Sequence, residues 1–217
     1  MRKLAQIQAF NGGFKPNFSA KSTNWGALTT ATAWYDKIVL NGGTGVVIKS
    51  FSIVNGIVSF YLKTSNANLF DFFLNALNIT EIYKQNIPNA YGLYIFDNNL
   101  TNVDSLILHN DIRDIRLNRN QLVSYNPTSL PPLLTTFEMP NNQLTSFNLS
   151  VPFPTTTTVI NISNNLITTA GWTASEPWAA SMPTTTNCTI KLSNNTNSAS
   201  GTTFASILTS KGYTLIY

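Results

Sequence analysis

The sequence predicts a solenoid of stacked repeats over residues 67–217, preceded by a small β-rich module or attachment arm over residues 1–66. The solenoid is expected to carry a short parallel β-sheet on its concave side and irregular or 3₁₀ connections on its convex side. Two observations predict this fold. Asn residues recur at a nearly constant step within one apolar frame, and the segments between them contain prolines, which disfavour long helices.

The repeat is marked by anchor residues that are all asparagines. They are Asn75, Asn98, Asn120, Asn142, Asn165 and Asn195, separated by 23, 22, 22, 23 and 30 residues. Around the anchor at 120, apolar residues stand at offsets −5, −3, +2 and +5, namely Ile115, Leu117, Leu122 and Tyr125. Offsets −5 and −3 point to one side of a strand, so a short strand with a buried face is expected before each anchor.

The anchor amides are expected to form a continuous ladder. A side-chain amide carries both donors and an acceptor, so each Asn can bond backbone groups of neighbouring repeats at a turn that has no regular backbone partner. A single repeat cannot bury its own apolar side, and the repeats must therefore stack.

Two segments carry a family resemblance. Residues 93–100 read Leu-Tyr-Ile-Phe-Asp-Asn-Asn-Leu, and residues 115–122 read Ile-Arg-Leu-Asn-Arg-Asn-Gln-Leu. Both resemble the L-x-L-x-x-N-x-L motif of leucine-rich-repeat proteins. The resemblance covers about residues 67–217 and implies a curved solenoid, with Phe, Ile and Met often standing where that family has Leu. The C-terminal end also loosely resembles repeat domains of Bacteroidetes bacteria and their phages.

Other local signals define the remaining elements. Asn55-Gly56 between two apolar, β-branched runs predicts a hairpin in the N-terminal module. Residues 171–180, inside the longest repeat step, predict a short helix. Phe204, Ile207 and Leu208 have helical spacing, Gly212 is a helix stop, and the last residues are strand-like. This helix and strand predict a cap on the end of the stack.

Composition and charge argue against several classes of function. The charged fraction is 10% and the net charge is +4, without a run of like charges. The nearest approach to a basic stripe is Arg113, Arg116 and Arg119, which Asp111 and Asp114 dilute, so no nucleic-acid partner is expected. The apolar runs are too short for a membrane span, and the N-terminus does not have the pattern of a signal peptide.

A catalytic, metal or cofactor site is not expected. His109 is the only histidine and Cys188 the only cysteine. His109 is expected in a connection without a serine elbow nearby, and Cys188 is expected to be a small core residue. The sequence also lacks a phosphate-binding glycine motif and a carboxylate cluster with calcium-loop spacing. We therefore expect a non-enzymatic protein without a bound cofactor or metal.

The expected functional surface is the concave side of the sheet. The side chains that leave the core there include Tyr94, Phe96, Asp97, Asp114, Arg116, Asn118, Arg119, Glu138, Asn161 and Lys191. Tyr94 and Phe96 stand out because exposed aromatic side chains are enriched at binding centres. The alternative is that both pack against the N-terminal module.

The features together lead to a hypothesis about function. A small β-rich module joined to a repeat domain, few charges, an Asn- and Thr-rich surface and no cysteine pair suggest a bacteriophage virion component attached to capsid or tail. Such a chain would be made in the host cytoplasm and would contact other virion proteins, or a host surface protein or glycan. The N-terminal module could bring copies of the chain together. The alternatives are a bacterial surface adhesin and a cytoplasmic scaffold.

Overall fold

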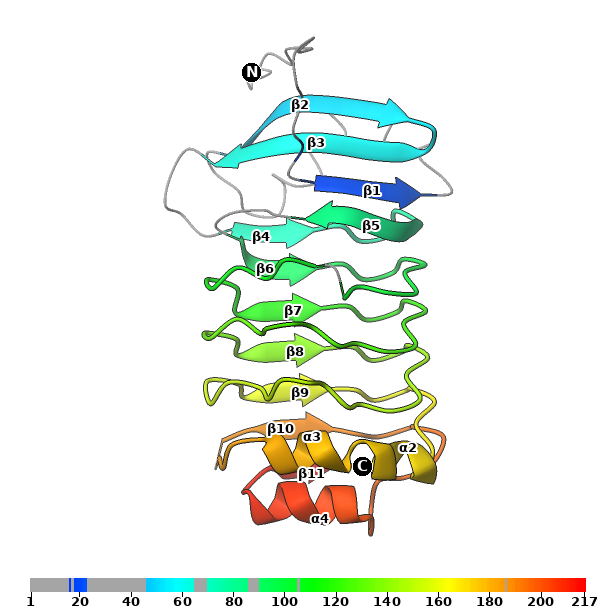
Figure 1. Ribbon diagram of the computed structural model, residues 1–217, viewed down its shortest axis with the longest axis vertical. Helices are drawn as coiled ribbons and strands as arrows, with labels where there is room; N and C mark the ends of the chain where they lie inside the picture. Colours follow the sequence, from blue (N-terminus) through cyan, green and yellow to red (C-terminus); the bar gives the residue numbers. More distant parts are fainter. Residues whose placement is uncertain are drawn as a thin grey trace.

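The computed structural model describes residues 16, 18–22, 46–64, 70–85, 90–104, 106–185 and 187–217. The described residues form two β-sheets that share a hydrophobic core. The antiparallel sheet lies at one end of the parallel sheet, and the helices lie at the other end (Figure 1). Of the predicted N-terminal module, residues 1–15, 17, 23–45 and 65–66 lie outside the described part.

The larger sheet has seven strands, and every neighbouring pair in it is parallel. In spatial order its strands are β11 (Thr214–Ile216), β10 (Thr189–Lys191), β9 (Val159–Asn161), β8 (Thr136–Glu138), β7 (Asp114–Arg116), β6 (Ala90–Tyr94) and β4 (Phe70–Phe73). One apolar residue near the middle of each strand pairs in register with the next and points into the core. These residues are Phe72, Leu93, Ile115, Phe137, Ile160, Ile190 and Leu215.

The smaller sheet has four antiparallel strands in the order β2 (Val46–Val54), β3 (Ile57–Thr64), β1 (Phe18–Ser22) and β5 (Ile79–Gln85). The predicted hairpin at Asn55-Gly56 is confirmed as the β2–β3 connection. Its two central residues have φ values of 50° and 74°. A two-residue type I′ turn needs positive φ at both positions, which Asn and Gly adopt at low cost.

The two sheets meet where β1 and β5 approach β4. The ring centroids of Phe18 on β1 and Phe72 on β4 lie 5.8 Å apart. The Ser22 hydroxyl donates a hydrogen bond of 2.6 Å to the carbonyl of Leu77, in the turn between β4 and β5. Because these contacts are buried, the core continues from one sheet into the other.

The predicted fold class, a leucine-rich-repeat solenoid with a separate β-rich module, is wrong. The structure has a seven-stranded parallel sheet and a four-stranded antiparallel sheet, and β5 joins the antiparallel sheet although it lies within residues 67–217. The segment between β4 and β6 therefore contains β5, a strand of the antiparallel sheet. A sequence period records how often strands recur, but it does not reveal which sheet the intervening chain joins.

Short helices occupy the end that carries the C-terminus (Figure 1). The single helix expected within residues 171–180 is present as two, α2 (Thr169–Ala174) and α3 (Glu176–Ser181). The C-terminal helix and strand are confirmed as α4 (Thr203–Ser210) and β11, with Gly212 between them at φ 90°. Within the described ranges, no helix is long and apolar enough to cross a membrane.

Candidate functional site

The parallel sheet has one face toward the core and one face, here called the open face, turned away from it. Two rows of side chains run along the open face in register. The first row is Asp71, Gly92, Asp114, Thr136, Val159, Thr189 and Thr214, and the second is Phe73, Tyr94, Arg116, Glu138, Asn161, Lys191 and Ile216. Most of these side chains are half-buried by their neighbours in the sheet. The open face is therefore ordered by strand register.

Buried asparagines fix that register. Asn142 is 7% exposed, and its Oδ1 accepts a hydrogen bond of 3.1 Å from the backbone N–H of Leu122. Its Nδ2 donates to the carbonyls of Leu117 at 3.0 Å and Met139 at 3.1 Å. Leu117 belongs to the preceding repeat and Met139 to the same one. One side chain therefore satisfies backbone groups of two adjacent turns. These groups lie beyond the strands, so the hydrogen bonds between strands do not satisfy them.

The same geometry repeats at three other anchors. Each has its Oδ1 bonded to a backbone N–H of the preceding turn and its Nδ2 bonded to carbonyls of both turns; these anchors are Asn98, Asn120 and Asn165. The residue just before each anchor has a positive φ: Asp97 at 56°, Arg119 at 53°, Asn141 at 57°, Asn164 at 53° and Asn194 at 56°. A tight turn thus places each anchor amide between adjacent turns of the chain.

Two of the predicted ladder residues depart from this pattern. Strand pairing places Phe73 opposite Tyr94, so the position that corresponds to Asn98 is Leu77 and the prediction of Asn75 as an anchor is wrong. The residue before Leu77, Ala76, has the expected positive φ of 56°. Asn195 keeps its two Nδ2 bonds, but its Oδ1 has no partner among the described atoms. The helical insertion of α2 and α3 precedes it and interrupts the repeat.

Tyr94 is not the exposed aromatic residue that the sequence suggested. It is 8% exposed, its ring centroid lies 4.4 Å from that of Phe73, and its hydroxyl donates to Asp114 Oδ2 at 3.0 Å. A Cβ on Gly92 would lie 2.5 Å from the Tyr94 ring, so only glycine leaves room for this ring over β6. Burial, and then the charge of Asp114, raises the pKa of Tyr94, and its hydroxyl therefore stays a hydrogen-bond donor.

Arg116 stands at the centre of the open face. Its Nη2 lies 2.9 Å from Asp114 Oδ2, its Nε lies 3.7 Å from Glu138 Oε2, and its guanidinium lies 5.3 Å from the centroid of the Tyr94 ring. The hydrogen bond with Asp114 raises the pKa of Arg116. The side chain nevertheless remains 43% exposed. The cation is therefore held in one orientation and still presented to solvent.

A second cluster lies beyond the ends of β6 and β7. Arg119 and Asp97 form a bidentate pair, in which Nη2 donates to Oδ2 at 2.7 Å. This hydrogen bond lowers the pKa of Asp97. The Arg119 guanidinium also lies 5.8 Å from the centroid of the Phe96 ring. Arg113 similarly lies 5.6 Å from the ring of Tyr91, so each of the three arginines rests on an aromatic ring of the preceding turn.

The remaining predicted face residues lie apart from these two clusters. Asn161 accepts from the backbone N–H and the hydroxyl of Ser163, at 3.1 and 2.7 Å. Lys191 is half-buried on β10, three strands from Arg116, and Asn118 is half-buried in the turn after β7. The open face therefore carries one interconnected cluster around Arg116, an Asp97–Arg119 cluster beside it, and isolated polar residues toward the C-terminal end.

The only histidine and the only cysteine lie away from the open face. His109 is half-buried in the connection before β7. Cys188 is 3% exposed just before β10, and burial raises the pKa of its thiol to about 12. A thiol with that pKa remains protonated at neutral pH and is a poor nucleophile. Among the described residues, no group of three or more His, Cys, Asp or Glu is placed to hold a metal ion.

The sequence analysis did not identify Phe73, Asp71 or Gly92 as parts of the open face. Strand pairing places Asp71 and Asp114 on either side of Gly92. Burial, and then the charge of Asp114, raises the pKa of Asp71. For Asp71 and Phe73 the signal that could have identified them is the register of β4, which the misplaced anchor at Asn75 obscured. Gly92 could have been found from its own anchor, because it stands six residues before Asn98, as Asp114 stands six residues before Asn120.

We expect Asp71→Asn to stabilise the protein at pH 7, by less than about 1 kcal/mol because the carboxyl is only partly buried. The raised pKa means that the ionised carboxylate is disfavoured in the folded state. At about pH 3 and below the carboxyl is mostly protonated in both the folded and unfolded states, so the gain should largely disappear there. Thermal unfolding at both pH values checks this, with the exposed Asp111→Asn as control. A lower melting temperature for the variant at pH 7 would contradict it.

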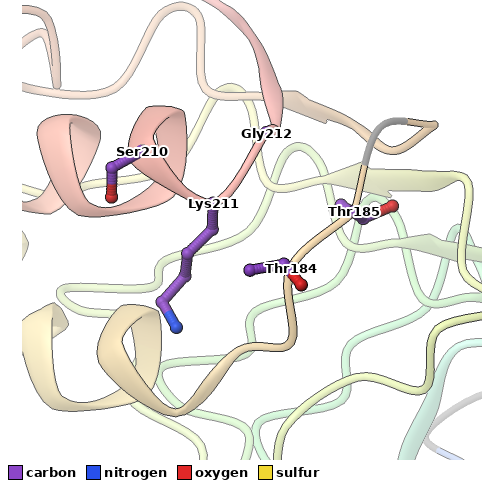
Figure 2. Close-up of a pocket in the computed structure, with 5 residues that line it drawn as sticks. All are labelled: Thr184, Thr185, Ser210, Lys211 and Gly212. Atoms are coloured by element: carbon purple, nitrogen blue, oxygen red, sulfur yellow. The ribbon is translucent and has the colours of Figure 1, made fainter.

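The described part of the chain also has surface hollows outside the open face. One, of about 450 Å³, is lined by Thr184, Thr185, Ser210, Lys211 and Gly212, as shown in Figure 2. Its only charged group, the Lys211 ammonium, donates to the carbonyl of Met182 at 2.7 Å, which ties the C-terminal end of α4 to the chain after α3. Another, of about 420 Å³, lies beside α4, and a further one, of about 400 Å³, lies between connections of the repeat and α3.

Comparisons with known proteins give no relative from which a function could be transferred. No family model matches the chain, and neither a curated protein nor a solved structure matches it.

Proposed function

We propose that this chain is a non-enzymatic recognition or assembly protein that contacts a partner protein through the open face of its parallel sheet. The observation that carries the proposal is Arg116. Hydrogen bonds to Asp114 and a ring contact with Tyr94 hold its guanidinium in place, and 43% of its side chain remains exposed. Arginine and aromatic residues are enriched among the side chains that contribute most to protein interfaces.

The order of the open face also supports a binding role. A partner that docks on preordered side chains immobilises few of them, so less conformational entropy is lost on binding. The anchor asparagines and the strand register supply that order without any contact from the partner. The Asp97–Arg119 cluster extends the ordered surface beyond the ends of the strands.

The proposed setting is a bacteriophage particle, with the chain attached to capsid or tail and the open face in contact with another virion protein. The support is compositional: 10% charged residues, an Asn- and Thr-rich surface and a β-rich part joined to a repeat. A bacterial surface adhesin is the second candidate, because an ordered, mostly uncharged face would serve host contact equally well.

Quantitative mass spectrometry of purified particles separates these settings. The virion proposal predicts this chain at a fixed ratio to the major capsid protein through successive purification steps. A chain that is lost from the particles and recovered with cell envelopes would contradict the proposal and favour the adhesin.

We expect Arg116→Ala to weaken attachment to the partner about tenfold or more, the cost of a residue that dominates an interface. Arg116→Lys should also weaken attachment, because lysine keeps the charge but loses the planar, bidentate guanidinium. The measurement is the number of copies retained per particle when the variant is supplied in limiting amount. The control is Lys63→Ala, which removes an exposed cation from the antiparallel sheet. Equal retention of Arg116→Ala and the control would contradict a role for the open face.

A further inference from the structure

The two ends of the open face carry opposite charges. From β4 to β8 the open face holds three carboxylates, those of Asp71, Asp114 and Glu138, and one cation, Arg116. Among the described open-face residues of β9, β10 and β11, Lys191 is the only charged one. The open face is therefore acidic over β4–β8 and basic toward the end that carries the helices.

The charges at the two ends are not neutralised within one copy of the chain. Arg116 is paired with Asp114 and Glu138, whereas neither Asp71 nor Lys191 forms an ion pair or a side-chain hydrogen bond with any described residue. Four strands, β6, β7, β8 and β9, separate β4 from β10. Because neighbouring strands lie about 4.8 Å apart, these two charges are about 24 Å from each other.

A second copy of the chain in reversed strand order would bring these opposite charges together. In an isologous dimer, the same surface of both copies meets across a two-fold axis. With the axis parallel to the strands and between β7 and β8, the strands β7, β6 and β4 face β8, β9 and β10 of the second copy. Arg116 then faces Glu138 of the second copy, and Lys191 faces Phe73 with Asp71 one row away. The symmetry makes each contact twice.

The other two-fold arrangements of the open face match its charges less well. An axis through β8 places Glu138 against its own copy, an axis through β7 does the same with Arg116, and an axis between β8 and β9 places Arg116 against Lys191. Like charges that face each other across an interface are unfavourable. An axis through β9 leaves β4 and β6 uncovered, and an axis along the stack leaves Lys191 opposite Thr189.

We propose that the open face binds a second copy of this chain in the reversed register, with Lys191 of each copy reaching Asp71 of the other and Arg116 reaching Glu138. The inference rests on the proposed function, in which the open face contacts a protein, and it names that protein. Lys191 and Asp71 stand in different rows, two residues or about 7 Å apart along the strands, a span that the flexible four-carbon stem of lysine covers.

The size of the contact sets the expected affinity. Six strands of each copy overlap, which gives a width of about 29 Å, and the two rows extend about 14 Å along the strands. Each copy therefore buries on the order of 400 Å², about half of what a standard interface buries per partner. We expect a reversible dimer with Kd of about 10–100 µM at low salt, weakened by added salt because it depends on exposed charges.

Analytical ultracentrifugation of the full chain over about 5–500 µM, a range that brackets this Kd, tests the proposal. Lys191→Glu and Asp71→Lys should each weaken the dimer about tenfold or more, because each places like charges opposite one another. An equimolar mixture of the two variants should dimerise like the wild type, because the new carboxylate of one faces the new ammonium of the other. Lys63→Glu, an exposed position on the antiparallel sheet, is the matched control and should leave the dimer unchanged.

The rescue in the mixture can arise only between copies, since the two positions lie about 24 Å apart in one copy. A wild-type chain that stays monomeric up to about 500 µM would overturn the proposal, as would a mixture that dimerises no better than either variant alone. Loss of Arg116→Ala from particles in a monomeric chain would overturn only this inference and leave a different protein on the open face. A dimer that the mixture rescues supports it, even if particle retention ignores Arg116→Ala and contradicts the proposed function.

Discussion

Replacing Asn142 by leucine is expected to destabilise the protein by about 3 kcal/mol or more. The substitution removes an acceptor for the N–H of Leu122 and a donor to the carbonyls of Leu117 and Met139. Each buried backbone group left unpaired costs about 1–3 kcal/mol, and leucine has no donor or acceptor that could replace the lost hydrogen bonds. In a chain of this length, the melting temperature should fall by about 6–12 °C, as followed by circular dichroism.

The matched control is Gln143→Leu, the next residue along the chain. The Gln143 side chain is exposed and outside the stack, so its replacement should change stability by no more than about 0.5 kcal/mol. Equal melting temperatures for the two variants would show that the anchor amides do not hold adjacent turns together. The register of the open face would then need another explanation.

Gly171→Ala is expected to destabilise the protein by about 2–3 kcal/mol, although alanine is the better helix former by about 1 kcal/mol. Gly171 lies in α2, and a Cβ there would collide with the backbone carbonyl oxygen of Thr145 and lie 2.9 Å from Ile167 Cγ2. The first of these is a backbone atom, so no side-chain rotation relieves the collision.

Thermal unfolding separates the helix propensity of alanine from the collision with Thr145, because the first raises the melting temperature and the second lowers it. The control is Thr173→Ala, an exposed position on the same helix where alanine should be neutral or slightly stabilising. If Gly171→Ala raised the melting temperature as intrinsic propensity suggests, the close packing of α2 against the turn at Thr145 would be incorrect.

The sequence predicted the features that depend on local chemistry. Asn55-Gly56 identified a hairpin because its turn requires positive φ. The spacing of the anchors located β6, β7, β8, β9 and β10, because each strand ends just before an anchor turn. Gly212 located the end of α4 for the same reason: glycine adopts its φ of 90° at little cost.

The features that the sequence did not predict depend on contacts between distant segments. Residues 79–85 are an ordinary strand-forming segment in the sequence, and only their pairing with β1 assigns them to the antiparallel sheet. Asn75 fits the spacing of the anchor asparagines in the sequence. The register of β4 with β6 nevertheless shows that Leu77 holds the position equivalent to Asn98. Tyr94 has an outward position on its strand, but Gly92 leaves space for its ring to lie flat against the sheet. Burial at such sites is set by the neighbouring strand.

Site-specific photo-crosslinking during particle assembly tests the central claim, that the open face is the contact surface, most directly. A photoreactive amino acid would replace Thr136, in the middle of the open face on β8, and in a separate variant Val123, an exposed residue in a connection. The proposal predicts that position 136 crosslinks to one discrete partner protein and that position 123 does not. Crosslinking of a partner from position 123 with none from position 136 would contradict it.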